Sequence, residues 1–248
     1  MIDPVAFTIF GRPIYWYGIC VALGFLAALA FWNSAVRRIG LPTGLGSDLA
    51  MVTMIAGILG ARAMYVAANW NYFSENLAAI PRIDQGGLIF YGGFLAASAA
   101  VAVMARVRAI PLWKLGDFTV SALPLGHAIG RMGCLLNGCC YGKPTDLPWA
   151  VFTAGEWRHP VQGYEAAFNL ALFFVCRRML LRQAPPGSVT AAYLTAYGLW
   201  RFAIEFLRGD PRMEAWAGLN AAQALSLVLV VLGGLLGGFV FFRSRPRP

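Results

Sequence analysis

A series of long apolar stretches, separated by short polar connections, constrains this chain more than any other feature. A helix needs about 20 mostly apolar residues to cross the hydrocarbon core of a bilayer, and each stretch has about that length. The stretches are continuous and lack the period-two alternation of a membrane β-barrel strand. The sequence therefore predicts an all-α polytopic membrane protein with seven transmembrane helices, near residues 14–36, 48–68, 87–105, 116–137, 164–182, 188–207 and 220–242.

The composition agrees with this class. Hydrophobic residues make up 59% of the 248 residues and charged residues only 12%, whereas a soluble domain has about 25% charged residues. These values exclude a soluble globular protein, and they exclude disorder, which requires low hydrophobicity and high charge. Because the chain has no internal repeat and no linker, we expect residues 1–248 to form a single integral-membrane domain.

The basic residues predict the orientation, because Lys and Arg accumulate in cytoplasmic loops. One set of loops contains eleven of them: Arg37, Arg38, Arg106, Arg108, Lys114, Arg177, Arg178, Arg182, Arg243, Arg245 and Arg247. The other set contains six: Arg12, Arg82, Lys143, Arg158, Arg208 and Arg212. We therefore expect a periplasmic N-terminus, a cytoplasmic C-terminus and a small periplasmic head near residues 138–163. Since sidedness explains the net charge of +9, no nucleic-acid partner is expected.

Three further basic residues, Arg62, Arg131 and Arg201, lie inside predicted spans. An intramembrane charge costs about 2.5–3.5 kcal/mol on insertion scales and is therefore a functional candidate. With the orientation above, each arginine lies roughly 9–10 Å below the outer surface. One arginine at this depth can snorkel to the interface, and Arg201 can pair with Glu205 along its own helix. Three arginines at one depth favour a shared binding site.

Other polar residues are expected near the same depth. They are, in chain order, Tyr17, Tyr91, His127, Gln162, Tyr164, Glu165 and Tyr197. Helical spacing places His127 and Arg131 on one face, and Tyr197, Arg201, Glu205 and Arg208 on another. The pattern predicts a positive, partly water-accessible cavity that opens to the outer leaflet. A lipid phosphate is its natural ligand, because the planar guanidinium fork binds phosphate bidentately.

Residues 130–142 read Gly-Arg-Met-Gly-Cys-Leu-Leu-Asn-Gly-Cys-Cys-Tyr-Gly. This segment resembles the signature of the prolipoprotein diacylglyceryl transferases, Gly-Arg-x-Gly-Asn-Phe-x-Asn-x-Glu-x-x-Gly, at Arg131, Gly133, Asn137 and Gly142. Five further segments are similar to motifs of the same family and occur in the same order, at 14–18, 60–66, 90–93, 159–166 and 201–210. Six motifs in register are a specific resemblance that covers most of the chain.

The resemblance implies a seven-span enzyme of the bacterial inner membrane with its active site toward the periplasmic leaflet. Such an enzyme transfers the sn-1,2-diacylglyceryl group of phosphatidylglycerol to the lipobox cysteine in the signal peptide of a prolipoprotein. The products are a thioether and glycerol 1-phosphate. The resemblance implies no metal or organic cofactor, and its partners are membrane lipid and the prolipoprotein.

The resemblance also suggests roles for particular residues. Arg131 and Arg201 are expected to hold the phosphate, and Arg62 either completes this clamp or holds helices together. The catalytic candidates are Arg131, Arg201, Tyr91, Glu205 and His127. The candidates for binding phosphatidylglycerol are Arg131, Arg201, Arg62, Tyr17, Asn137, Gly142, Tyr197 and Gln162.

The chain departs from the family pattern at three positions. Tyr91 stands where the family often has His, and a tyrosine with a pKa near 10 is a poor base at neutral pH. Glu205 is expected as a partner of Arg201 rather than as the base, and the base is left open. Cys134 replaces the first signature Asn, and Cys139 replaces the acidic residue.

Three interpretations of Cys134, Cys139 and Cys140 stay open. Cys134 forms a disulfide with Cys139 or Cys140 on the oxidising outer face, or the three bind zinc together with His127 or His159, or they are small buried residues. Two alternatives to the transferase also stay open. One is a transporter or scramblase for an anionic lipid or solute, and the other is a paralogue of the family with a changed acceptor.

Overall fold

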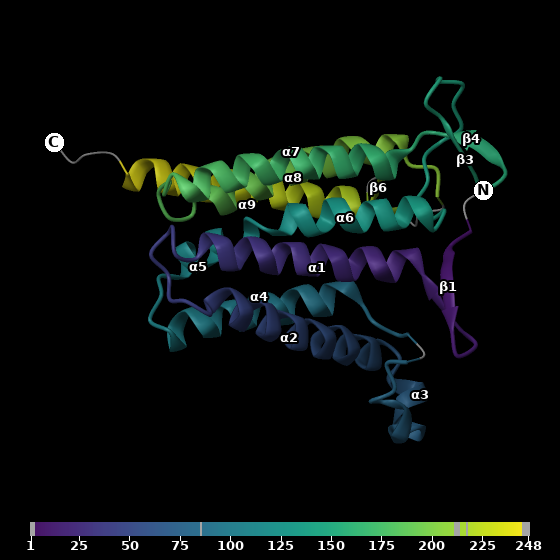
Figure 1. The fold of residues 1–248 in the computed structure, drawn as a ribbon, viewed down its shortest axis with the longest axis horizontal. Coiled ribbons are helices and arrows are strands. Elements are labelled where there is room, and N and C mark those ends of the chain that lie inside the picture. The colour runs from purple at the N-terminus through teal and green to yellow at the C-terminus, as the bar shows by residue number, and fades with distance from the viewer. Residues whose placement is uncertain (1–2, 85, 211–213, 217, 245–248) are drawn as a thin grey trace.

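The computed structural model describes residues 3–84, 86–210, 214–216 and 218–244 (Figure 1). Arg212, Arg245 and Arg247, which enter the count of loop charges, lie outside the described residues. All other basic residues named above lie within the described ranges.

Helices form at every predicted apolar stretch. The long helices are α1 (Trp16–Ala35), α2 (Leu45–Ala68), α4 (Phe90–Val107), α7 (Val161–Leu181), α8 (Ser188–Ile204) and α9 (Ala221–Arg243). The shorter helical elements are α3 (Trp70–Glu75), η1 (Leu77–Ala79), α5 (Leu112–Val120), α6 (Leu123–Leu136) and η2 (Glu205–Leu207). The strands are β1 (Val5–Ile9), β2 (Arg12–Tyr15), β3 (Val151–Thr153), β4 (Glu156–Arg158), β5 (Glu214–Trp216) and β6 (Leu219–Asn220). They pair as antiparallel hairpins, β1 with β2, β3 with β4 and β5 with β6.

Four described helices, α1, α2, α4 and α9, are long and apolar enough to cross a membrane. The α7 helix has sufficient length but buries the polar side chains of Gln162, Glu165 and Asn169, and α8 has only 17 residues. The structure is therefore mostly helical and consistent with an all-α membrane protein, and α7 and α8 differ from the four apolar helices because they carry polar groups inside the bundle.

The fourth apolar stretch is two helices rather than the single helix predicted at 116–137. The α5 helix ends at Val120, and α6 begins at Leu123 with Pro124 in its first turn. Proline has no backbone N–H and suits the start of a helix, where that donor has no intrahelical partner. The Ser121 hydroxyl donates to the carbonyl of Phe118 at 2.7 Å, which satisfies one of the carbonyls exposed by the break.

The long helices lie side by side with nearly parallel axes (Figure 1). The α1 helix lies between the α2–α4 pair and α6, and α7, α8 and α9 lie beyond α6 (Figure 1). A side chain at Gly24 of α1 would lie 2.8 Å from the carbonyl oxygen of Gly126 in α6. Small residues at such a contact let membrane helices approach closely, so α1 supports the helix that carries Arg131.

The apolar core and the polar cluster lie at opposite ends of the bundle. The core joins the second halves of α1, α4 and α7 to α5 and to the starts of α2 and α8, and Leu45, Leu49, Leu115 and Phe118 are fully buried in it. Asp117 fixes the start of α8 there, because its carboxylate accepts hydrogen bonds from the backbone N–H of Gly187 at 2.7 Å and of Thr190 at 2.8 Å. The polar residues of the cluster lie at the other end of the bundle.

Candidate functional site

Three arginines and two glutamates from three helical segments meet at the end of the bundle opposite the core. We call Arg131, Glu165, Arg201, Glu205 and Arg208 the arginine–glutamate cluster. Glu165 Oε2 on α7 lies 2.9 Å from Arg131 Nε on α6 and 3.9 Å from Arg208 Nη1, while Arg201 on α8 pairs with Glu205. All but Arg131 are buried, and only 14% of the Arg131 side chain is exposed. The cluster thus joins Arg131 to Arg201 through buried carboxylates.

The guanidinium groups of Arg131 and Arg201 keep unused donors. Arg131 interacts through Nε alone, and Arg201 through Nη1 alone, in the part of the chain that the structure describes. Arg208 differs, because its Nε and Nη2 both donate to the Asp210 carboxylate at 2.9 Å. Arg131 can therefore present Nη1 and Nη2 to an anion, and Arg201 can present Nη2, without either losing its carboxylate partner.

Glu165 is buried without a conventional hydrogen bond. It is 1% exposed, and neither carboxylate oxygen accepts a hydrogen bond from the described residues. The nearby Nε–H of Arg131 is directed at His127 Nε2, which accepts it at 3.2 Å. Charge alone therefore holds Glu165 between Arg131 and Arg208, and a buried carboxylate of this kind requires the positive charges around it.

His127 and Tyr197 belong to the same group of side chains. Their rings lie 5.5 Å apart between α6 and α8, and the Tyr197 ring stacks on Tyr193 at 5.7 Å. Because His127 Nε2 accepts a hydrogen bond, the imidazole is neutral with its proton on the other nitrogen. Tyr197 therefore lies on the side of α8 that faces His127 of α6.

The signature loop, residues 137–143, is held on both sides by backbone hydrogen bonds. The Gly142 N–H donates to the His159 carbonyl at 3.1 Å, and the Lys143 N–H donates to Leu207 at 2.8 Å. A side chain at Gly142 would lie 2.5 Å from that His159 oxygen, so only glycine fits between these segments. The loop therefore links the start of α7 to the segment that carries Arg208.

Two other predicted binding residues serve this loop. Gln162, 1% exposed, donates from Nε2 to the Cys139 carbonyl at 2.7 Å. Asn137 follows the last residue of α6, and its N–H donates to the Gly133 carbonyl at 2.9 Å. Both therefore contribute to the conformation of the loop beside the cluster.

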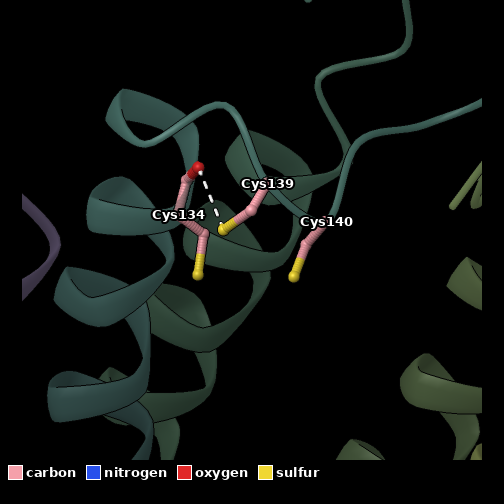
Figure 2. Close-up of side chains that lie close together, drawn as sticks. All are labelled: Cys134, Cys139 and Cys140. Atoms are coloured by element: carbon pink, nitrogen blue, oxygen red, sulfur yellow. Dashed lines mark hydrogen bonds between the residues drawn. The ribbon is translucent and has the colours of Figure 1, made fainter. Parts of the chain in front are cut away.

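Cys134, near the end of α6, lies beside Cys139 and Cys140 of the signature loop (Figure 2). Their sulfur atoms all lie within 4.8 Å of one another, and every thiol is free. Neither His127 nor His159 belongs to this group. The hydrogen bond from the Cys134 thiol lowers the pKa of Cys140, and the Arg208 and Arg131 charges act in the same direction. The structure thus has three free cysteines in mutual contact rather than a disulfide.

Arg62 is separated from the cluster by its own contacts. Its guanidinium donates to the carbonyls of Ala79 and Ile80 at 2.7 Å and of Gly86 and Gly87 at 3.0 Å. The charge also lies 5.3 Å from the centroid of the Phe73 ring. These contacts tie the connection between α2 and α4 to α2. Of the two roles expected for Arg62, its geometry supports the structural one.

Tyr17 and Tyr91 lie at the ends of different helices. Tyr91, half exposed in the first turn of α4, makes an edge-to-face contact with Phe90 at 6.0 Å and no hydrogen bond with the described part of the cluster. Tyr17 lies in the first turn of α1, where its backbone packs against Gly133 of α6. Tyr17 therefore borders the signature helix, whereas Tyr91 lies on the α2 side of α1.

Two buried members of the cluster, Glu165 and Arg208, were expected near the arginines but were not among the residues assigned a catalytic or binding role. The sequence did carry a signal, because both fall in family-like segments and Glu165 is a carboxylate beside an apolar run. Their importance follows from the ion pairs that cross between helices, which no single-helix periodicity reveals.

These helices, with a buried charged cluster inside one end of the bundle, define a polytopic helical membrane protein with an internal polar site. A sequence model of the prolipoprotein diacylglyceryl transferase family matches residues 4–238. The chain belongs to this family.

Curated relatives are similar to this chain over most of its length. The phosphatidylglycerol–prolipoprotein diacylglyceryl transferase of Clostridioides difficile is 33% identical over 96% of this chain and 93% of its own. The enzyme of the same name from Pseudoalteromonas translucida is 37% identical over 95% and 91%. That from Geobacillus kaustophilus is 39% identical over 88% and 85%.

Proposed function

We propose that this protein is a transferase that moves the sn-1,2-diacylglyceryl group of phosphatidylglycerol to the lipobox cysteine of a prolipoprotein. The thiolate sulfur attacks the sn-3 carbon of the lipid, and the bond from that carbon to the phosphate oxygen breaks. The products are a thioether on the protein and glycerol 1-phosphate. Family membership over residues 4–238 supports transfer rather than the transport of an anionic lipid or solute.

The observation that carries this proposal is the pair of arginines held by buried carboxylates. Negative charge accumulates on the phosphate as the carbon–oxygen bond breaks, so donors aimed at the leaving phosphate stabilise the transition state. Glu165 and Glu205 orient Arg131 and Arg201, which leaves Nη1 and Nη2 of Arg131 and Nη2 of Arg201 available for phosphate oxygens. We assign the phosphate to these two arginines.

The other residues of the cluster take supporting roles in this proposal. Both carboxylate oxygens of Glu205 have partners: Oε2 pairs with Arg201, and Oε1 accepts a hydrogen bond from Asn220 Nδ2 at 2.8 Å. It therefore orients Arg201 rather than accepting the thiol proton. His127 likewise orients Arg131. Tyr197, Asn137, Gly142 and Gln162 shape the walls of the site and Tyr17 borders it, whereas Tyr91 lies apart from it on the α2 side of α1.

We further propose that the single domain 1–248 crosses the bacterial inner membrane seven times. The α5–α6 pair, α7 and α8 supplement the four apolar helices, and their axes run alongside the others (Figure 1). Their polar side chains turn toward the bundle, as intramembrane polar groups do. The excess of basic residues in the opposite loops supports an orientation with the N-terminus, the signature loop and the cluster toward the periplasmic leaflet.

The test is a transfer reaction with the purified full-length chain. Phosphatidylglycerol vesicles and a lipobox peptide are incubated with the protein, and mass spectrometry follows the peptide. We expect the mass of one diacylglyceryl group on the peptide cysteine. A peptide with serine in place of the cysteine and vesicles of phosphatidylcholine are the controls. Lipid flipping without peptide modification would replace this proposal with a scramblase, and modification of a non-lipobox thiol alone would indicate a changed acceptor.

A further inference from the structure

The proposed transfer needs a thiolate, because the thiol form is a poor nucleophile. The side chains that could remove the proton are otherwise engaged, since His127 accepts from Arg131 and Glu205 pairs with Arg201. We propose that Cys134, Cys139 and Cys140 bind one zinc ion, and that this zinc binds the lipobox thiol as its fourth ligand. The inference rests on the transferase function proposed above and supplies its thiol-activating group.

The three sulfur atoms already have a spacing that suits one metal ion. They lie within 4.8 Å of one another, and three sulfurs bound to one zinc at about 2.3 Å lie roughly 4 Å apart. Figure 2 shows the three side chains turned to the same side of the loop. Small side-chain rotations would bring all three into the coordination sphere, and thiolates are the ligands that zinc prefers.

The backbone holds this arrangement in place. The Cys139 N–H donates to the Cys134 carbonyl at 3.2 Å, and Gln162 holds the Cys139 carbonyl at 2.7 Å. Cys140 has a φ of +60°, a left-handed conformation that is uncommon for a residue with a side chain. Such strain persists where surrounding structure imposes it, and it occurs often at functional sites. The loop is thus built to bring these sulfurs together.

The number of ligands indicates a catalytic rather than a structural zinc. Structural zinc sites have four protein ligands, whereas catalytic sites have three and one open position. The described residues offer three sulfurs here and no fourth metal-binding group within the same distance. His159 Nδ1 lies 3.4 Å from the Tyr164 hydroxyl, and His127 is held by Arg131. The fourth coordination position is therefore open to a substrate group, and the lipobox thiol is the substrate group that zinc prefers.

The site lies beside the proposed phosphate site. Cys134 follows Arg131 by three residues on α6 and so lies on nearly the same helix face. The Gly209 N–H donates to the Tyr141 carbonyl at 3.0 Å, which holds the segment of Arg208 beside the loop that carries Cys140. Zinc with three thiolates has a net charge of −1, which becomes −2 with the substrate thiolate. Arg131 and Arg208 offset this charge. A thiolate bound here is therefore placed next to the lipid phosphate that leaves.

The step balances without an oxidant or reductant. Binding to zinc releases the thiol proton, as a metal-bound thiol is deprotonated, and the proton passes to solvent. The sulfur lone pair forms the bond to the sn-3 carbon while the carbon–oxygen bond electrons leave with glycerol 1-phosphate. The thioether product has no negative charge and is a weak zinc ligand, so it dissociates and the open position is restored.

The experiment measures metal binding by the full-length protein in detergent. Zinc is titrated and its content determined by elemental analysis for the wild type, for Cys134→Ala, Cys139→Ala and Cys140→Ala, and for Cys20→Ala as the matched control. Cys20→Ala keeps the Cβ atom that packs against Gly133. We expect one zinc per chain in the wild type and the control, and at least tenfold weaker binding in the three variants. Retained thermal unfolding temperatures exclude misfolding as the cause.

Cobalt substitution tests the open position without relying on activity. Cobalt in place of zinc gives thiolate charge-transfer absorption and visible bands that report its coordination. We expect a lipobox peptide to change the visible bands and its serine analogue to leave them unchanged. An unchanged spectrum with the thiol peptide would overturn the thiol-activating role, and a disulfide among these cysteines in the protein as isolated would overturn the metal site.

The activity measurement separates this inference from the function on which it rests. Full transfer after complete zinc removal would overturn the zinc proposal and leave the transferase intact. A cobalt response to the thiol peptide without any transfer from phosphatidylglycerol would keep a thiol-binding metal site and overturn the transferase. We expect zinc removal to lower the transfer rate at least tenfold and zinc addition to restore it.

Discussion

Arg131 on α6 and Glu165 on α7 form an ion pair of 2.9 Å in which neither carboxylate oxygen accepts a hydrogen bond from the described residues. Glu165 therefore depends on the charges of Arg131 and Arg208 for its stability as an anion, and the arginines depend on it for their position. The phosphate-binding geometry and the packing of α6 against α7 are thus determined by the same pair.

Glu165→Gln should affect both stability and activity. The substitution removes the buried counter-charge of Arg131 and Arg208, and breaking a buried ion pair costs about 3–5 kcal/mol. We expect a lower thermal unfolding temperature and a fall in kcat/KM of at least about tenfold. Glu156→Gln, at an exposed carboxylate paired with Arg158, is the matched control and should change neither. Equal stability of both variants would mean that the cluster does not hold the helices.

Arg131→Lys and Arg201→Lys should reduce transfer while the protein stays folded. Lysine keeps the charge but lacks the fork that binds a phosphate and a carboxylate together. Loss of one preorganised donor to a leaving oxyanion costs about 10²–10³ in kcat, so we expect losses of that order. Arg82→Lys, at an exposed residue 3.6 Å from Asp84, is the control. If both cluster variants retained full activity, the phosphate assignment would be wrong.

Arg62→Met should destabilise the connection between α2 and α4 without removing activity. The substitution leaves four backbone carbonyls, from Ala79 to Gly87, without their guanidinium donor. Hydrogen bonds to charged groups contribute about 1.5–3 kcal/mol each, so we expect faster limited proteolysis within residues 79–87. Specific activity of the folded protein should stay within about twofold. A loss of activity with unchanged proteolysis would assign Arg62 to the phosphate.

Gly142→Ala should disturb the signature loop. The new Cβ would lie 2.5 Å from the His159 oxygen and 2.6 Å from the His159 Cβ, so the backbone must shift. We expect a lower unfolding temperature and reduced transfer. Gly163→Ala is the control, because its Cβ would meet Pro160 only at 3.9 Å. Identical behaviour of the two variants would show that the loop tolerates displacement.

Asp117→Ala should weaken the fold at the end far from the cluster. Asp117 accepts from the N–H groups of Gly187 and Thr190 and from the Thr190 hydroxyl, so it caps α8 from another helix. Loss of a helix cap costs about 0.5–2 kcal/mol. We expect a lower unfolding temperature at an unchanged KM for phosphatidylglycerol. A changed KM would show that the two ends of α8 are coupled.

The sequence predicted the helices well because long apolar runs have few alternative structures in a membrane. The break at Ser121 and Ala122 was missed, since the run is apolar on both sides and only Pro124 indicates a helix start. The helical spacing predicted that Tyr197, Arg201 and Glu205 share one side of a helix, because one helix fixes those directions, and Arg201 does pair with Glu205.

Side-chain contacts between different segments could not be predicted from the sequence in the same way. Arg62 has the same apparent depth as Arg131 and Arg201, yet its partners lie in the loop that follows its own helix. Contact among the three cysteines likewise depends on the turn at Gly138 and on the left-handed backbone conformation of Cys140. Depth along a helix is a property of one segment, whereas a site depends on which segments become neighbours.

The separation of the apolar core from the charged cluster has a practical consequence. Substitutions that tighten the packing around Leu49, Leu115 and Phe118 act a bundle length away from the arginines and the cysteines. Detergent-resistant variants can therefore be selected at that end by heat challenge alone, and they should retain wild-type chemistry at the other end.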